Sequence, residues 1–172
     1  MAATTVVNAA YDTSGNGGRK LVRLSNGWLV ATAFDATNNV RYFYVSKDNG
    51  ATWQALCRST LMNNPNVSLA SVGTKLYVVN AQSNVSILLW VIDVTTQANI
   101  DIGNSGSITI DSGLSGGISG VSSVINGAGT EIHVCWSSKV STLPNSFNIR
   151  YAKGTIDGSG NVTWGMSPPG YN

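Results

Sequence analysis

The stretch RYFYVSKDNGATW, residues 41–53, decides the fold. Its first half is rich in aromatic and β-branched residues and predicts a β-strand, and Asp48-Asn49-Gly50 then predicts a tight turn. The Asp48 carboxylate can accept hydrogen bonds from backbone N–H groups of this turn, and Gly50 supplies a conformation that a side chain would resist. Thr52 can add a hydroxyl bond, and Trp53 offers a ring to pack between neighbouring sheets. We therefore interpret this segment as a stapled β-hairpin in which Asp48 is structural rather than catalytic.

A second hairpin precedes the first. The segment KLVRLSNGWLVATAF, residues 20–34, consists of two apolar runs joined at Asn26-Gly27, both of which tolerate a positive φ. Four strands with short turns are therefore predicted within about 40 residues.

The pattern returns further along the chain. NGWLVATAF (26–34), GTKLYVVNA (73–81) and GTEIHVCWS (129–137) each place a glycine-containing turn before an apolar strand, and Leu29, Leu76 and Ile132 are 47 and 56 residues apart. A similar segment, RYAKGTIDGSGNVTW, occurs at residues 150–164 and repeats the pattern of RYFYVSKDNGATW. The middle unit keeps its strands but lacks the turn motif. Repeats of this length predict an all-β chain that forms a β-propeller segment of about three four-stranded antiparallel blades. We place these blades at approximately 17–57, 66–110 and 117–166, in one domain or partial domain that covers 1–172.

Composition excludes several functions. Only 10% of the residues are charged, and the formal net charge of +2 comes from scattered basic residues, so we expect no nucleic-acid partner. No apolar run approaches the roughly 20 residues of a membrane helix, so we expect no membrane insertion, and the N-terminus lacks the pattern of a secretory signal. Cys57 and Cys135 lie far apart and outside any ligand spacing, so we expect neither a structural zinc site nor a disulfide framework.

The turn motif resembles the Asp-box, or BNR repeat, of sialidases and related propellers, whose pattern is S-x-D-x-G-x-T-W. The residues that carry the resemblance as structural turn residues are Ser46, Asp48, Gly50, Thr52 and Trp53, and, in a lengthened second copy, Asp157, Thr163 and Trp164. Sialidase propellers have more blades than three. The resemblance therefore implies a sialidase-like propeller whose ring is closed either by oligomerisation of this chain or by missing sequence.

The same resemblance suggests two site residues. Sialidases grip a substrate carboxylate with arginines, the first of which opens an inner strand, and Arg19 stands at about that place, followed by Lys20-Leu21 instead of Ile-Pro. Asp35 lies where sialidases often have an acidic residue and is the candidate catalytic acid. The alternatives are a solvated arginine at a strand start and an aspartate that caps its own turn. The single glutamate, Glu131, has no tyrosine close in sequence, so the full catalytic set of a sialidase is not visible.

Sugar binding requires fewer residues than hydrolysis. Aromatic rings stack on the apolar faces of pyranose rings, and among the strand aromatics Trp28 and Tyr42 are candidate ligand-binding residues beside Arg19, although strand aromatics commonly serve as packing. His133 is the only histidine, and its alternation with apolar neighbours favours a histidine held inside a sheet over a catalytic base. Loops from Asp12 and Asp101 have a faint calcium-loop pattern without the terminal glutamate, so calcium remains a secondary expectation and no cofactor or metal is assigned.

These observations favour recognition of a cell-surface glycan or polysaccharide. The richness in Asn, Ser, Thr and Gly resembles the BNR-type domains of phage tail fibres, which implies an extracellular or virion-surface location without a signal peptide in this chain. An exo-sialidase or related glycoside hydrolase, as a part or a protomer, is the alternative. A purely structural assembly module, which would bind no glycan, is the third possibility.

Overall fold

The computed structural model describes residues 4–13, 18–83, 85–103, 106–114, 117–140 and 143–165, and these residues form β-strands joined by turns. The strands are β1 (Leu21–Arg23), β2 (Leu29–Asp35), β3 (Val40–Ser46), β4 (Gln54–Ser59), β5 (Val67–Val72), β6 (Lys75–Gln82), β7 (Ser86–Asp93), β8 (Ile108–Ser112), β9 (Ile118–Ile125), β10 (Glu131–Val140), β11 (Leu143–Ile156) and β12 (Val162–Trp164). Over the described residues the model has no helix that is long and apolar enough to cross a membrane.

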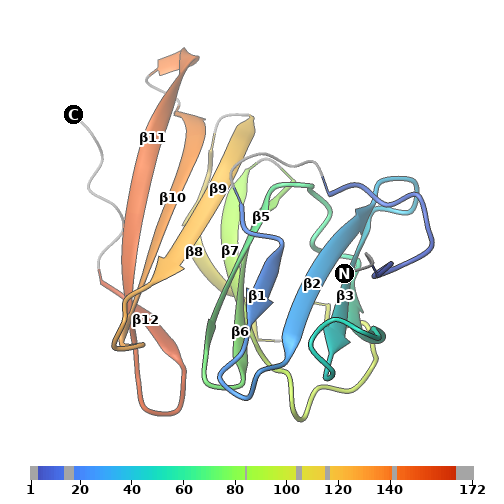
Figure 1. Cartoon of the computed structure of the whole chain (residues 1–172). Helices are drawn as coiled ribbons and strands as arrows, with labels where there is room; N and C mark the ends of the chain where they lie inside the picture. The colour runs from blue at the N-terminus through green and yellow to red at the C-terminus, as the bar shows by residue number, and fades with distance from the viewer. Residues whose placement is uncertain are drawn as a thin grey trace.

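The strands form three four-stranded antiparallel sheets, each built from consecutive strands (Figure 1). We call them the first sheet (β1–β4), the middle sheet (β5–β8) and the third sheet (β9–β12). Register within them is continuous over long ladders, for example from Leu29 opposite Ser46 to Asp35 opposite Val40. The prediction of an all-β fold with three four-stranded antiparallel units is therefore confirmed, and the described part of the chain contains no sheet that closes on itself.

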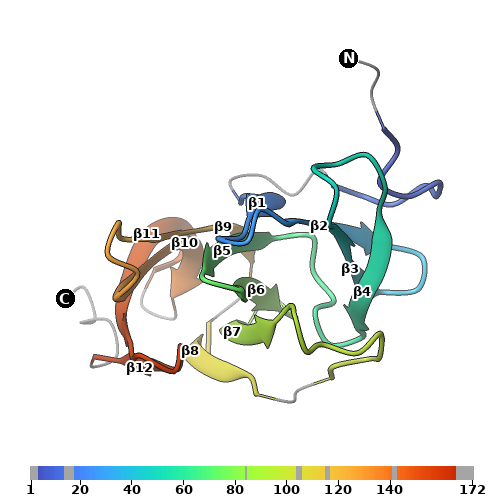
Figure 2. The ribbon, with the colours of Figure 1, turned by 60° about the horizontal axis from the view of Figure 1, so that its bottom comes forward.

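The three sheets stand side by side in an arc. The inner strands β1, β5 and β9 lie next to one another along one side, and β4, β8 and β12 lie at the opposite edges (Figure 2). The inner strands are also joined directly, because the backbone N–H of Ser123 and its hydroxyl both donate to the Ser68 hydroxyl, at 3.0 and 2.9 Å. This arrangement is that of adjacent propeller blades around an axis.

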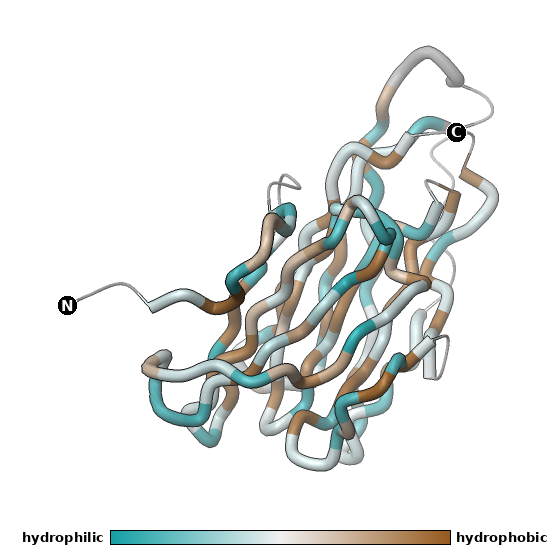
Figure 3. Tube along the Cα trace, turned by 90° about the vertical axis from the view of Figure 1, so that its right-hand side faces the viewer, coloured by the Kyte–Doolittle hydropathy of each residue, from teal (hydrophilic) through white to brown (hydrophobic). Residues whose placement is uncertain are grey.

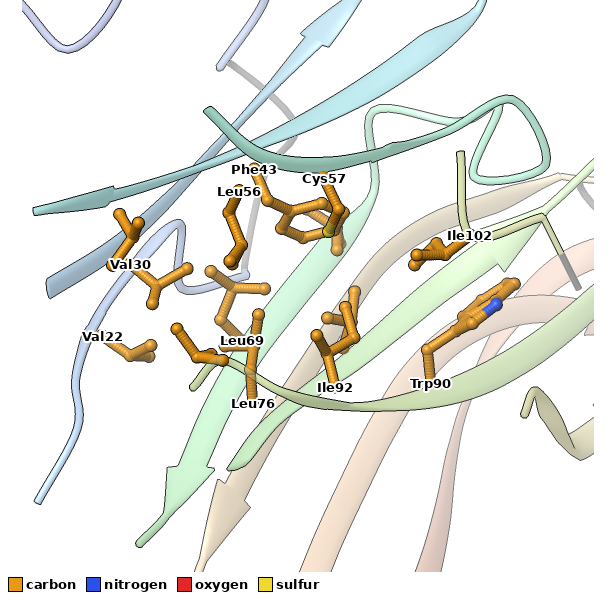
Figure 4. Close-up of a cluster of buried hydrophobic side chains, with 14 of the residues drawn as sticks. Val22, Val30, Phe43, Leu56, Cys57, Leu69, Leu76, Trp90, Ile92 and Ile102 are labelled. Carbon is orange, nitrogen blue, oxygen red and sulfur yellow. The ribbon is translucent and has the colours of Figure 1, made fainter. Parts of the chain in front are cut away.

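Two apolar clusters hold the sheets together. The first lies between the first and middle sheets and includes Val30, Phe43 and Trp90 (Figure 4). The second lies between the middle and third sheets and includes Tyr77 and Trp136. Hydrophobic and hydrophilic residues alternate along parts of several strands (Figure 3). The middle sheet is thus covered on both faces.

The two end sheets each have a face turned away from the middle sheet. On the first sheet this face carries Tyr42 and Tyr44, and the Tyr11 ring stacks on Tyr42. The backbone of the N-terminal segment pairs with β2 through an antiparallel bridge between Asp12 and Phe34. On the third sheet the corresponding face carries several exposed apolar side chains, and we call it the outer face of the third sheet.

Candidate functional site

The turn that follows β3 is stapled by its aspartate. Asp48 Oδ1 accepts hydrogen bonds from the Thr52 backbone N–H and from the Ser46 hydroxyl, each at 2.8 Å, while the Thr52 hydroxyl donates to Oδ2. Gly50 has a φ of +93°, and its N–H donates to the Ser46 hydroxyl at 2.7 Å. The Thr52 hydroxyl is the largest cause that lowers the pKa of Asp48 to about 2. The three hydrogen bonds that this carboxylate accepts all come from residues 46–52 of its own turn, as a structural role requires.

The turn after β11 uses the same device with different residues. Asp157 accepts hydrogen bonds from the backbone N–H groups of Ser159 and Asn161 and from the Asn161 side chain, at 2.8, 2.9 and 3.1 Å. Asn161, four residues after the aspartate, therefore occupies the place that Thr52 has in the first turn, whereas Thr163 is exposed. Trp164 packs against the second apolar cluster, while Trp53 is half-buried.

The middle sheet has an equivalent aspartate that the sequence analysis missed. Asp93 ends β7, and its Oδ1 accepts from the Thr95 hydroxyl at 2.7 Å and from the Thr95 N–H at 3.1 Å. The signal in the sequence was the Asp-x-Thr spacing at the end of an apolar run. All three turns lie at the lower end of the sheets in the view of Figure 1.

The opposite, upper end gathers most of the other candidates. Asp35 ends β2 and is 7% exposed; Oδ1 accepts from the Thr37 and Asn38 N–H groups, and Oδ2 accepts from the Asn38 side chain at 2.8 Å. The Asn38 side-chain hydrogen bond, followed by its backbone bond, lowers the pKa of Asp35, which is therefore a carboxylate at neutral pH. The turn-capping alternative describes these contacts fully, and a catalytic role for Asp35 stays a prediction.

A stack of tyrosines lies close to Asp35. The rings of Tyr11 and Tyr42 are parallel, with centroids 5.1 Å apart and 5° between their planes, and Tyr44 follows at 6.5 Å from Tyr42. Burial, then the charges and hydrogen bond of Tyr42, then the Asp35 charge raise the pKa of Tyr11. The sequence indicated Tyr42 but not Tyr11, because Tyr11 lies in an N-terminal segment without strand periodicity.

Cationic side chains lie at the same end. Arg41 is 1% exposed, and its NH2 group donates to the Asn64 carbonyl at 2.7 Å. Burial lowers the pKa of Arg41 to about 9 and that of Lys20 to about 8, while the Asp12 charge acts in the opposite direction on both. Arg19 is exposed, and its carbonyl accepts from the Leu69 N–H, which places it between the first and middle sheets. A carboxylate-binding role for Arg19 stays a prediction.

An asparagine network fixes this end across all three sheets. Asn80 Nδ2 donates to the Asn64 and Asn66 carbonyls, at 3.2 and 3.0 Å, and Asn66 Nδ2 donates to the Ile118 carbonyl at 2.9 Å. The 60–66 segment is thereby tied to the middle and third sheets. We define the upper-end cluster as Tyr11, Asp12, Lys20, Asp35, Arg41 and Tyr42. Of these, Arg41 donates to the Asn64 carbonyl of this network on the face turned to the middle sheet, whereas Tyr42 lies on the opposite face of the first sheet with Tyr11 stacked on it.

Trp28, the other aromatic candidate, lies outside this cluster. Its ring packs against the first apolar cluster, and Lys47 Nζ lies over the ring at 4.4 Å from the centroid. Both faces of the indole therefore have neighbours, and this arrangement favours a packing role over a platform for a sugar.

A second polar group lies on the outer face of the third sheet. His133 Nδ1 and the Tyr151 hydroxyl are 2.7 Å apart, His133 Nε2 is 3.7 Å from Glu131 Oε2, and Lys153 Nζ donates to Glu131 Oε1 at 2.9 Å. A shallow hollow here is lined by Ser122, Cys135 and Tyr151 among others. His133 was expected inside a sheet; it is in the sheet, but on its open face. The pairing with Tyr151 follows from strand register, which spacing along the sequence does not reveal.

The described residues contain no group of three or more His, Cys, Asp or Glu side chains that could hold a metal ion. Of the two calcium-like loops, Asp101 accepts from the Gly103 N–H at 3.0 Å, while residues 14–17 and 104–105 lie outside the described residues. Cys57, on β4, is buried, which raises its pKa to about 12, and Cys135, on β10, is exposed; both are free thiols in separate sheets.

No protein-family model matches the chain, and no curated protein matches it. The fold is similar to that of an alpha-L-arabinanase from Penicillium chrysogenum complexed with arabinobiose, with a TM-score of 0.50 and 15% identity over 95% of this chain and 53% of that chain. An alpha-L-arabinofuranosidase from Fusarium graminearum in complex with an iminosugar inhibitor gives a TM-score of 0.48 and 14% identity over 85% of this chain and 46% of that chain. This chain spans about half the length of these solved structures. The likeness to the arabinanase supports a propeller-type fold.

Proposed function

We propose that this chain recognises carbohydrate through the upper-end cluster. The observation that carries the proposal is the Tyr11–Tyr42 stack near the Asp35 carboxylate, because an aromatic face next to a fixed hydrogen-bond acceptor suits a sugar ring and its hydroxyls. The parallel stack holds Tyr11 in one orientation before any ligand arrives. The propeller-type fold agrees with this proposal, because the solved arabinanase that it resembles is a complex with arabinobiose.

Recognition explains the cluster better than hydrolysis does. A tyrosine nucleophile needs a lowered pKa, whereas the pKa of Tyr11 is raised, so its hydroxyl stays protonated. A general acid at neutral pH needs a raised pKa, whereas that of Asp35 is lowered. Both groups are suited to hydrogen bonding, with Tyr11 as donor and Asp35 as acceptor. The sialidase or related glycoside hydrolase therefore ranks second.

The finer proposal is attachment to a cell-surface polysaccharide by an extracellular or virion-surface protein. It rests on the composition and on the resemblance of the 46–53 turn to sialidase-type repeats. Arg19, exposed beside the cluster, would then contact an acidic sugar through its guanidinium.

The test is glycan-array screening followed by calorimetry on the best glycan. We expect binding that falls at least about tenfold in Tyr11→Ala, since removal of an aromatic platform costs more than about 1.4 kcal/mol. The matched control is Tyr151→Ala, an exposed tyrosine on a different sheet, which should bind as the unsubstituted chain does. Absence of binding to any glycan would support the structural assembly module instead, and release of sugar during the assay would support the hydrolase.

A further inference from the structure

The outer face of the third sheet occupies the position at which each preceding sheet meets its neighbour. The repeat places Val30, Tyr77 and His133 at the same point of the second strand of each sheet. Val30 is buried against the middle sheet, and Tyr77 reaches the third sheet, where its hydroxyl donates to the Gly160 carbonyl at 2.9 Å. His133 points the same way from the third sheet. The outer face of the third sheet is therefore equivalent to the faces through which the first sheet packs on the middle sheet and the middle sheet packs on the third.

This face carries the side chains of an interface. Val124, Phe147, Ile149 and Tyr151 are 53%, 50%, 76% and 49% exposed, although they are four of the larger apolar residues of the chain. Cross-strand register places them on one face, since Val124 lies opposite His133, Cys135 opposite Tyr151 and Ser137 opposite Ile149. Phe147, Ile149 and Tyr151 follow one another at alternate positions of β11 and form an exposed apolar stripe, which marks a surface for another protein layer.

We propose that this face binds the same face of a second copy of the chain, so that two third sheets stack about a two-fold axis. A head-to-tail contact would require the free face of the first sheet, where Tyr11 already stacks on Tyr42. The same-face contact meets no such obstacle. It is also self-complementary in charge, because Glu131 and Lys153 lie together on the face and a two-fold axis can pair each with its opposite in the partner.

The size of the face sets the strength of the contact. Three long strands, about 4.8 Å apart and rising about 3.4 Å per residue over eight residues, present a plane of about 400 Å². Because protruding side chains add to the area of this plane, the two copies together bury about 1,000 Å² of accessible surface, which is the lower limit for a specific interface. The expected species is therefore a dimer in rapid, concentration-dependent exchange with the monomer.

Light scattering after size-exclusion chromatography, from about 1 to 200 µM, tests the proposal. We expect the mass to rise from 18.0 kDa toward twice that value, and Ile149→Glu to remain monomeric throughout. The matched control is Ile100→Glu, an isoleucine that is 57% exposed on the β7–β8 connection and should dimerise normally. Circular dichroism confirms that both variants are folded. A monomer at every concentration would overturn the proposal and would favour coverage of this face by a further sheet of a longer chain. A dimer that persists in Ile149→Glu would also overturn the proposal.

Discussion

At the scale of single residues, three aspartates stabilise equivalent turns by accepting hydrogen bonds within them. Asp48, Asp93 and Asp157 each lie at or just after the end of the third strand of a sheet, and each accepts hydrogen bonds from groups two to four residues further on. These turns leave backbone N–H groups without strand partners, and a carboxylate satisfies them more strongly than a neutral acceptor. Hydrogen bonding accordingly lowers the pKa of all three. The lower turns of the molecule are therefore sensitive to acid.

Asp48→Asn should lower the thermal midpoint at pH 7 by about 2 to 4 °C, as expected for loss of a charge-assisted staple in a chain of this size. The folded pKa of about 2 lies below the ordinary value of 3.8, so the contribution of Asp48 is present above about pH 4 and is lost as the pH falls through 2. Scanning calorimetry from pH 7 to pH 2 should show the two midpoints converging. A difference that stays constant across this range would contradict the assignment.

The role of a residue could be predicted from the sequence where its hydrogen-bond partners lie only a few positions away in the chain. Asp48 reaches residues within four positions, so the 46–53 motif alone indicated a stapled hairpin. Asn161 was missed because the second turn is longer, and its amide replaces the threonine hydroxyl. Tyr11 could not be assigned from sequence, because its neighbour Tyr42 is supplied by a strand 31 positions away across the fold.

At the scale of elements, strands on end sheets and strands on the middle sheet differ in pattern. β10 alternates between the buried Ile132, Val134 and Trp136 and the more exposed His133 and Cys135, whereas β3 is buried almost throughout and was recognisable by its aromatic and β-branched residues. β7, with the sequence SILLWVID, is almost continuously apolar because both of its faces are buried. Its apolar run indicated a strand even without the turn motif, but the identity of the two sheets that cover it depends on packing that no local pattern encodes.

The segment that leads into β1 approaches β5 and β9 so closely that one position tolerates only glycine. A Cβ on Gly18 would lie 1.7 Å from the Val67 carbonyl oxygen and 3.0 Å from that of Val121, both backbone atoms of the neighbouring sheets. Gly18→Ala should therefore reduce the free energy of unfolding by about 2 kcal/mol or more, measured by urea denaturation.

The control for this prediction is Gly127→Ala, since a Cβ at Gly127 would meet open space. It should change the stability by less than about 0.5 kcal/mol. Equal effects of the two substitutions would mean that β1, β5 and β9 are further apart than the structure places them.

At the scale of the whole molecule, the middle sheet joins both apolar clusters. Tyr77 and Val79 face the third sheet, while Leu76 and Val78, alternate residues of the same strand, face the first. Loss of either cluster therefore exposes one face of the middle sheet, and the three sheets should unfold together.

Trp90→Ala tests this coupling. Trp90 is 1% exposed, lies in the first cluster and donates from Nε1 to the Gly103 carbonyl at 3.1 Å, so its truncation should cost about 3 to 5 kcal/mol. Amide hydrogen exchange should accelerate in β10 as much as in β3, although β10 belongs to the other cluster, and Trp90→Phe should cost less. Faster exchange confined to the first two sheets would show that the third sheet is stable independently.

Because each sheet is a contiguous segment, the order in which the chain is synthesised has a consequence for its folding. The four strands of the first sheet emerge from the ribosome before β5 does, and their short turns allow them to pair early. The apolar strand β7 emerges long before β9–β12 can cover its second face. During that interval the middle sheet is the segment of this protein most exposed to aggregation, and the one for which a chaperone would matter most.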